Sequence, residues 1–382
     1  MKGYTKGTSG LIKNINKANV LDVIKKRQPI SRIEVSKVLK MSKSTISAIV
    51  DELIEEGLVV ENGFSEKGTV GRKPIQLSFN PNAKFVVGMS VESSNTIGVL
   101  TNMDGKILKK IKWQTSIGEQ AFNEIINGIQ ELLKSGKNVI GIGIGLPGIT
   151  DIQTGVVNAP GLKWNNFELK KKLSKIFNYS IYVDNSVNYA ALGERWIGCC
   201  REIENFVLIN IGNGIGSGIY VNGKLLRGNA YAAGEVGYMA TGEDVFKNTY
   251  SYGDYGYFER KASLSALVGL VSKDLPHINT IEGVIKGFKE QNPICVQAVS
   301  SCFIKNLSMG IANIVSILNP EAIIIGGDIL NYEIDIIHEI KEKVKKIVPF
   351  DFGIKMAQLG EDAAAIGAVA DVLLNTNNLI LL

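Results

Sequence analysis

The stretch Val183 to Glu194, with the sequence VDNSVNYAALGE, places polar side chains where a strand passes into a helix. Asn185 and Ser186 stand at this junction, within reach of a ligand that carries hydroxyl groups. A carboxylate at position 186 could take a proton from such a hydroxyl, whereas a serine can only hold it by hydrogen bonding. No histidine lies nearby in the sequence to act as a base. Whether the chain is an enzyme therefore depends on what surrounds Ser186.

Other short motifs, most of them rich in glycine, accompany this stretch along the chain. They are GRKP at Gly71 to Pro74, LPG at Leu146 to Gly148, NIGNGIGSGIYVNG at Asn210 to Gly223, AGEVGY ending at Tyr238, EAIIIGGD ending at Asp328 and LGEDAAAIGA ending at Ala368. Glycine permits tight turns and a close approach of the backbone to a ligand or a packed helix. One such run is weak evidence, but their order and spacing together are specific.

Strands alternate with helices after Asn80-Pro81-Asn82, which marks a domain boundary. Predicted strands cover residues 85–91, 97–101, 106–115, 139–145, 205–211, 216–221 and 322–325, and predicted helices cover 118–134, 302–318 and 363–374. The first three strands are expected to form an antiparallel meander that turns at Asp104-Gly105. This mixed order predicts an α/β fold of two lobes with a cleft between them.

Three short helices are predicted before this boundary. The first covers residues 19–27, the second begins after the cap Ser31, with Glu34 completing a capping box, and the third covers 43–56 after the cap Ser42. The residues of the second helix that we expect to be buried are Val35, Val38 and Leu39.

Small polar and basic side chains crowd the first turns of the third helix. Because a recognition helix enters the major groove by its N-terminal end, they suit base edges and phosphates. The residues are Ser42, Lys43, Ser44, Thr45 and Ser47. Strands at 58–60 and 75–77 predict a wing on which Arg72 and Lys73 reach a phosphate or a narrow minor groove. A three-helix interaction module with solvated lysines is the alternative.

Positive charge is concentrated in this N-terminal segment. Up to Asn80 the sequence has 14 Lys or Arg against 8 Asp or Glu, whereas the remainder has 28 against 29. A basic first domain on a near-neutral body is typical of a nucleic-acid-binding protein.

Composition argues against several other classes of protein. Hydrophobic residues make up 45% of the chain and charged residues 21%, and no apolar run approaches the roughly 20 residues of a membrane span. The N-terminus lacks the apolar region of a signal peptide, so we expect a cytoplasmic protein. The four cysteines, Cys199, Cys200, Cys295 and Cys302, form no CxxC pair and are expected to be reduced. Neither of the two histidines lies near them, so no zinc site is predicted.

The motifs quoted above, in this order, resemble those of the ROK family of sugar kinases and sugar-responsive repressors. The resemblance implies a winged helix-turn-helix DNA-binding domain at residues 1–80, followed by a two-lobed, actin-like ATPase (ribonuclease H-like) ROK domain at residues 83–382. Lobe one is expected to comprise residues 83–186 plus the C-terminal helix, and lobe two residues 187–362.

The resemblance also implies a sugar site. The matching positions are Asn185, Ser186, Glu235, Tyr238 and Glu259, of which Tyr238 departs from the family's histidine and Glu259 is aligned least securely. Carboxylates and amides suit adjacent sugar hydroxyls because they accept or bridge two hydrogen bonds. From its place in the sequence, Trp164 is expected to line the cleft, with a buried packing role as the alternative. Gly148 is expected to let the ligand approach the backbone, with a simple turn as the alternative.

Two parts of the phosphotransfer machinery depart from the kinases of that family. The first is the catalytic position, where Ser186 stands in place of the kinases' aspartate. The second is the first phosphate loop, where Glu92 replaces a glycine and Ser90 replaces an aspartate that would position Mg²⁺. The second loop, Gly212 to Gly218, and Gly326-Gly327 persist, which we interpret as tight turns and close packing rather than retained nucleotide binding.

The family's zinc-binding segment is absent from the chain. Five aromatic residues take its place, and we interpret them as a self-packed loop, with a lid over a sugar ring as the alternative. They are Tyr250, Tyr252, Tyr255, Tyr257 and Phe258.

These features predict a sugar-responsive transcriptional regulator. We expect a repressor of sugar-utilisation genes that binds a palindromic double-stranded DNA operator as a homodimer and needs no cofactor. Xylose, or a related plant-derived sugar, is the expected effector, bound without phosphotransfer. The alternatives are an active ATP-dependent sugar kinase with an appended DNA-binding domain, and a regulator controlled by a protein partner.

Overall fold

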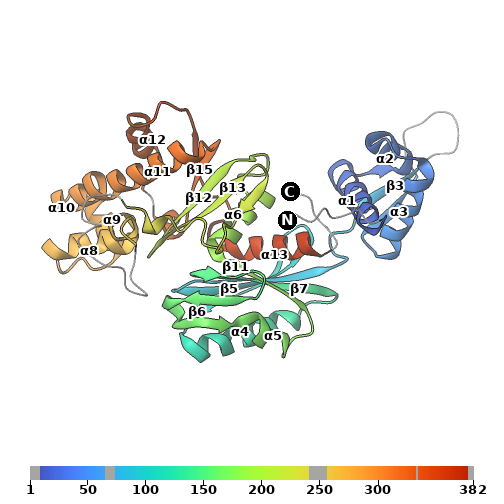
Figure 1. Cartoon of the computed structure of the whole chain (residues 1–382), viewed down its shortest axis with the longest axis horizontal. Coiled ribbons are helices and arrows are strands. Elements are labelled where there is room, and N and C mark those ends of the chain that lie inside the picture. The colour runs from blue at the N-terminus through green and yellow to red at the C-terminus, as the bar shows by residue number, and fades with distance from the viewer. Residues whose placement is uncertain (1–8, 65–73, 241–255, 333, 377–382) are drawn as a thin grey trace.

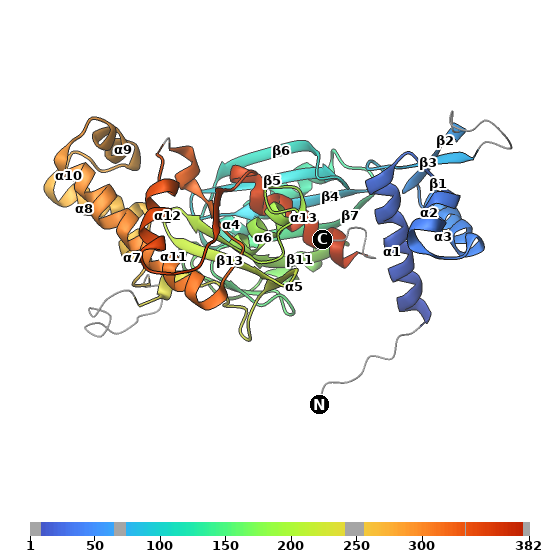
Figure 2. The ribbon, with the colours of Figure 1, turned by 90° about the horizontal axis from the view of Figure 1, so that it is seen from above.

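The computed structural model describes residues 9–64, 74–240, 256–332 and 334–376. A winged-helix unit lies at one end of the elongated molecule, and three helices of lobe two, α8 (Leu264–Asp274), α9 (Ile281–Lys289) and α10 (Pro293–Val296), lie at the other (Figure 1, Figure 2). The sheets of the two α/β lobes lie between these ends, and a pair of helices runs between the two sheets (Figure 1).

The N-terminal unit contains three helices and a small antiparallel sheet. The helices are α1 (Ser9–Arg27), α2 (Arg32–Leu39) and α3 (Lys43–Glu55), and the strands, in sheet order, are β1 (Ile30–Ser31), β3 (Ile75–Phe79) and β2 (Val59–Phe64). The predicted capping box is confirmed, since the Ser31 hydroxyl accepts from the Glu34 N–H and the Glu34 carboxylate accepts from the Ser31 N–H. Ser42 caps α3 by accepting from the N–H of Thr45 at 3.1 Å, as predicted.

Two details of this unit differ from the prediction. The first helix begins at Ser9 rather than at residue 19. Val38 is exposed rather than buried, because the buried side of α2 runs through Val35 and the half-buried Leu39, one turn apart, and Val38 lies at its edge.

Lobe one is built on a five-stranded sheet. Its strands, in sheet order, are β11 (Ser180–Asn185), β7 (Val139–Leu146), β4 (Phe85–Val91), β5 (Asn95–Asn102) and β6 (Ile107–Gln114). The antiparallel meander of β4 to β6 is confirmed, and β7 and β11 run parallel to β4. Helices α4 (Gly118–Leu133) and α5 (Leu169–Ser174) lie on one side of the sheet and α13 (Ala363–Asn375) on the other (Figure 1). The carboxyl ends of the three parallel strands therefore meet at one edge, where α/β proteins usually bind ligands.

A second, smaller sheet in lobe one was not predicted. It pairs β8 (Ile149–Thr150), β9 (Val156–Ala159) and β10 (Trp164–Glu168), and it follows directly on the strand that ends at Leu146.

Lobe two, like lobe one, is built on a five-stranded sheet with helices packed against it. Its sheet, in order, contains β14 (Lys224–Leu226), β13 (Ile215–Val221), β12 (Phe206–Ile211), β15 (Ala322–Gly326) and β16 (Gly353–Met356). Its further helices are α7 (Glu259–Ala262), α11 (Ile304–Leu318) and α12 (Ile337–Lys345).

A continuous helical stretch, Pro293–Leu318, is long and apolar enough by length and composition to cross a membrane. No apolar run of this length was predicted, since Lys305 and Asn306 interrupt the apolar residues. Half of its most apolar window is buried inside the protein, and Leu307 and Ile311 are fully buried in the core of lobe two. Here the stretch packs as a core helix.

Helices α6 (Ser186–Trp196) and α13 cross between the two sheets with their backbones in contact. A Cβ atom on Gly367 would lie 1.6 Å from the carbonyl oxygen of Tyr189, and one on Gly193 would lie 2.4 Å from that of Ala363. Only glycine fits at either position.

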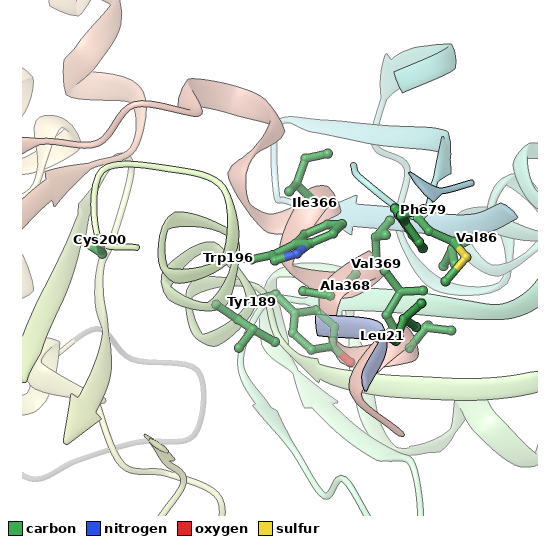
Figure 3. Close-up of a cluster of buried hydrophobic side chains, with 14 of the residues drawn as sticks. Leu21, Phe79, Val86, Tyr189, Trp196, Cys200, Ile366, Ala368 and Val369 are labelled. Atoms are coloured by element: carbon green, nitrogen blue, oxygen red, sulfur yellow. The ribbon is translucent and has the colours of Figure 1, made fainter. Parts of the chain in front are cut away.

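The buried core around these helices continues into the winged-helix unit. One cluster of buried side chains contains Leu21 of α1, Phe79 of β3, Val86 of β4 and Val369 of α13 (Figure 3). An ion pair between Lys25 Nζ and Asp104 Oδ1, 2.7 Å apart, lies beside this contact. The winged-helix unit and the helix pair thus share one hydrophobic core.

Candidate functional site

A cavity of about 1030 Å³ opens between the two lobes. Its lining includes the residues that follow the parallel strands of lobe one and the glycine-rich turns of lobe two. All seven predicted sugar-site residues contribute to this lining: Gly148, Trp164, Asn185, Ser186, Glu235, Tyr238 and Glu259. The fold brings them together, and their roles as ligands stay predictions.

Asn185 is largely engaged by the protein itself. Its side-chain oxygen caps α6 by accepting from the N–H groups of Val187 at 2.8 Å and Asn188 at 3.3 Å, and its Nδ2 donates to the carbonyl of Gly148 at 2.8 Å. One amide hydrogen is left for a ligand. Asn185 therefore fixes the shape of this corner of the cavity as well as facing it.

Ser186 has a carboxylate beside it. Its hydroxyl interacts with the carboxyl group of Glu92, which directly follows β4, and this interaction lowers the pKa of Glu92. Ser90 Oγ donates to Glu92 Oε1 at 3.3 Å. Burial raises the pKa of Glu92 to about 7, and the charge of Asp328 adds to the increase. Only histidine was expected as a base near Ser186. Glu92 was not predicted because the two residues are 94 positions apart and meet only when β4 and β11 share a sheet.

Glu235 and Glu259 approach the cavity from lobe two. Burial raises the pKa of both carboxyl groups, and the charge of Glu259 raises that of Glu235 further. Glu259 Oε2 accepts from the N–H of Ile215 at 2.7 Å, an interaction that favours its charged form. Glu259 thus holds the second glycine-rich turn, and Glu235 contributes a carboxyl group to the cavity wall.

The remaining predicted residues divide between packing and the rim. Trp164 is 2% exposed, stacks on Phe167 with ring centroids 4.3 Å apart, and donates from Nε1 to the carbonyl of Gly118. Tyr238 is 48% exposed. Gly148 has a φ of +78°, and a Cβ atom there would meet the Asn158 carbonyl at 2.3 Å. Packing is therefore sufficient to explain both Trp164 and Gly148.

The second loop also has a packing explanation. A Cβ atom on Gly218 would lie 2.6 Å from the Ala191 side chain and 2.7 Å from the Val187 carbonyl, so glycine permits the contact of β13 with α6. At Gly214 a Cβ atom would lie 2.6 Å from Glu259 Oε2. A carboxylate against this turn opposes the binding of a polyanion.

Some predicted residues lie outside the described part of the chain. These are Arg72 and Lys73 of the wing, and Tyr250, Tyr252 and Tyr255 of the aromatic segment. Phe258 is fully buried, and its ring lies where a side chain on Gly310 would be. The end of that segment is therefore packed into lobe two.

The predicted DNA-binding residues of α3 are accessible. Ser42, Lys43, Ser44 and Thr45 are exposed and Ser47 is half-buried, whereas Ile46, Ile49 and Val50 on the opposite side are buried. The helix thus presents its polar N-terminal end to solvent.

An ionic network behind the cavity was also missed. Arg227, which follows β14, pairs with Asp184 on β11, and Asp184 accepts from the N–H of Asn185 at 2.7 Å. Tyr189 of α6 donates to Asp371 of α13 at 2.9 Å. Asp184 lies in the VDNS stretch and could have been predicted from that motif, but no motif in the sequence marks Arg227.

Comparison with known proteins agrees with this architecture. Residues 13–60 match the winged helix-turn-helix DNA-binding family and residues 86–374 match the ROK family. The chain is 32% identical to the xylose repressor of Caldicellulosiruptor bescii, over 96% of this chain and 97% of that protein, and 29% identical to the xylose repressor of Bacillus subtilis, over 93% and 94%. The crystal structure of a ROK family transcriptional regulator, a homologue of the Escherichia coli MLC protein, superposes with a TM-score of 0.80 at 25% identity, over 95% of this chain and 96% of that one. The chain therefore belongs to the ROK family, as a member with an N-terminal winged helix-turn-helix and a two-lobed, actin-like body.

Proposed function

We propose that the protein is a sugar-responsive transcriptional repressor that binds its sugar without phosphorylating it. The observation that carries this proposal is the single buried core that joins the winged-helix unit to α13, the helix between the two lobes. The relatives named xylose repressors, which match over 96% and 93% of the chain, support it.

The arrangement provides a physical route for regulation. A sugar that binds between the lobes favours one lobe arrangement, and α6 and α13 lie between the two sheets that would move. An effector can change operator affinity only through its different affinities for the two arrangements, so sugar and DNA must weaken each other reciprocally. A homodimer would place two copies of α3 on the half-sites of a palindromic operator.

Xylose, or a closely related sugar, is our proposal for the effector. The relatives at 32% and 29% identity carry that name. The absence of phosphotransfer is proposed because carboxylates of Glu92 and Glu259 lie against the two turns that would have to receive phosphate groups.

A mobility-shift titration tests the proposal. Full-length protein is mixed with DNA from upstream of its own gene cluster, and monosaccharides and disaccharides are added. We expect xylose to release the DNA from the wild-type protein but not from Glu235→Ala, which should bind DNA as well as the wild type does. Glu119→Ala, a substitution on the exposed surface of α4, is the matched control and should respond normally. A normal sugar response of Glu235→Ala would show that the cleft is assigned wrongly.

Two further measurements on the same full-length protein test the alternative functions, a sugar kinase and a regulator controlled by a protein partner. Release of ADP from ATP in the presence of a sugar would identify a kinase, for which Glu92 beside Ser186, with its pKa near 7, would be suited as the base. Failure of every sugar to change the melting temperature or to release DNA would favour control by a protein partner.

A further inference from the structure

Glu92 brings a carboxyl group into the cavity at the point where Ser186 lines it. The residue comes immediately after β4, and both Glu92 and Ser186 contribute to the cavity wall. Ser90 Oγ donates to the carboxyl group at 3.3 Å, and the Ser186 hydroxyl also interacts with it. Its two serine neighbours thus come from β4 and from the start of α6.

This carboxyl group has unused capacity to accept hydrogen bonds. An ionised carboxylate offers about four lone-pair sites, and two serine hydroxyls occupy at most two of them. The charge that acts on the Glu92 carboxyl group, that of Asp328, is negative and opposes its ionisation. A half-buried carboxylate in this setting is stabilised by any further donor that a ligand brings.

We propose that Glu92 is a direct ligand of the sugar and accepts a hydrogen bond from one of its hydroxyl groups. This inference rests on the proposed function, since it requires that a sugar occupies the cavity. Because the Glu92 carboxyl group interacts with the Ser186 hydroxyl and both residues line the cavity, a carboxylate carried by either residue reaches the same part of the ligand. Glu92 therefore supplies from the end of β4 the carboxylate that position 186 lacks.

The proposal also defines the chemical class of the ligand. Among the described residues, the charged side chains that line the cavity are five acidic and two basic ones: Glu92, Glu235, Glu259, Asp328 and Glu361 against Lys112 and Lys163. One of the two basic groups, Lys112, is paired with Glu361. Such a lining favours an uncharged polyhydroxy compound over a sugar phosphate.

Calorimetric titration of full-length variants tests the proposal. The probe is D-xylose, with D-glucose in its place if xylose does not bind to the wild type. We expect Glu92→Gln and Glu92→Gly each to weaken sugar binding by about tenfold or more, the effect of losing one hydrogen bond to a charged group. The double variant Glu92→Gly with Ser186→Asp should regain most of the lost affinity. Glu119→Gln on the surface of α4 is the matched control, and melting temperatures confirm that each variant is folded.

The possible outcomes are distinct. Wild-type affinity in both single variants would overturn the proposal and leave the repressor function standing. A loss confined to Glu92→Gly would show that the residue acts on the shape of the turn, because glutamine preserves that shape, and this too would overturn the proposal. If folded wild-type protein bound no sugar at all, the proposed function would fail, and the role of Glu92 would fail with it.

Discussion

Arg227 donates a hydrogen bond from Nε to Oδ2 of Asp184 at 2.7 Å, and this ion pair joins lobe two to the strand that ends at Asn185. Asp184 is only 1% exposed, and its second oxygen accepts from the N–H of Asn185 and from Nδ2 of Asn188. The ion pair lowers the cost of burying both charges. It connects the cavity wall of lobe one directly with the sheet of lobe two.

Removal of the arginine should be strongly destabilising. Arg227→Met leaves Asp184 buried without a cation, and we expect the free energy of unfolding to fall by about 3–5 kcal/mol, measured by urea denaturation at pH 7. The double variant Arg227→Met with Asp184→Asn should recover a large part of this loss, since neither charge is then left unpaired. A decrease of less than about 1 kcal/mol in the single variant would show that the pair contributes little.

Stability should depend on pH through Glu92. Its folded-state pKa of about 7 lies above the ordinary value of 4.5, so between these pH values the folded protein holds a proton that the unfolded chain has released. The free energy of unfolding should therefore fall as pH rises from about 5 to 7, by up to about 1.4 kcal/mol per pH unit.

Comparison with Glu92→Gln isolates this contribution. The charged group that acts on Glu92 is Asp328, which in turn faces Lys112, and the pKa of Glu235 and Glu259 is raised as well. Because of these groups, the free energy of unfolding falls with rising pH in the Glu92→Gln variant as well as in the wild type. Denaturant titrations from pH 5 to pH 8 should show a smaller slope for the glutamine variant, and parallel curves would contradict the prediction.

Lys43 at the start of α3 should contribute to DNA binding through charge alone. It is exposed next to the cap Ser42, so Lys43→Ala should weaken binding to all DNA sequences similarly and should lower the salt dependence by about one released counterion. Fluorescence anisotropy at several salt concentrations measures both effects. Lys134→Ala, at the end of α4, is the control and should change neither.

The crossing of α6 and α13 should not tolerate a side chain at its centre. A Cβ atom on Gly367 would overlap the backbone of Tyr189, so Gly367→Ala should destabilise the protein by about 2 kcal/mol or more in denaturation experiments. Gly269→Ala provides the control, since this glycine lies within α8 with nothing within 4 Å of an added Cβ atom. There alanine should stabilise the helix by about 0.5–1 kcal/mol. Equal effects of the two substitutions would show that the crossing can relax.

Local patterns in the sequence predicted the helices and strands well, but they did not predict the contacts between residues that are far apart in sequence. The caps Ser31 and Ser42 and the three-stranded meander depend on neighbours in the chain, and the structure confirms them. The contact of Glu92 with Ser186 and the pairing of Arg227 with Asp184 join residues far apart in sequence. Such contacts depend on which strands are adjacent, and no periodic pattern records this.

Burial of single residues was harder to predict for the same reason. Trp164 was expected to face the cleft, with packing as the alternative, and it does both because β10 brings it against Phe167 at the edge of the cavity. Exposure of Val38 follows from the narrow buried side of a helix of only eight residues.

The hydrophobic cluster that contains Leu21, Phe79, Val86 and Val369 bears on how the protein could be re-engineered. A chimera that grafts the winged-helix unit onto a different sensor would have to transplant the patch around Val86 and Val369 as well, or Leu21 and Phe79 would face water. The interchangeable part is therefore the winged-helix unit together with the surface on which it rests.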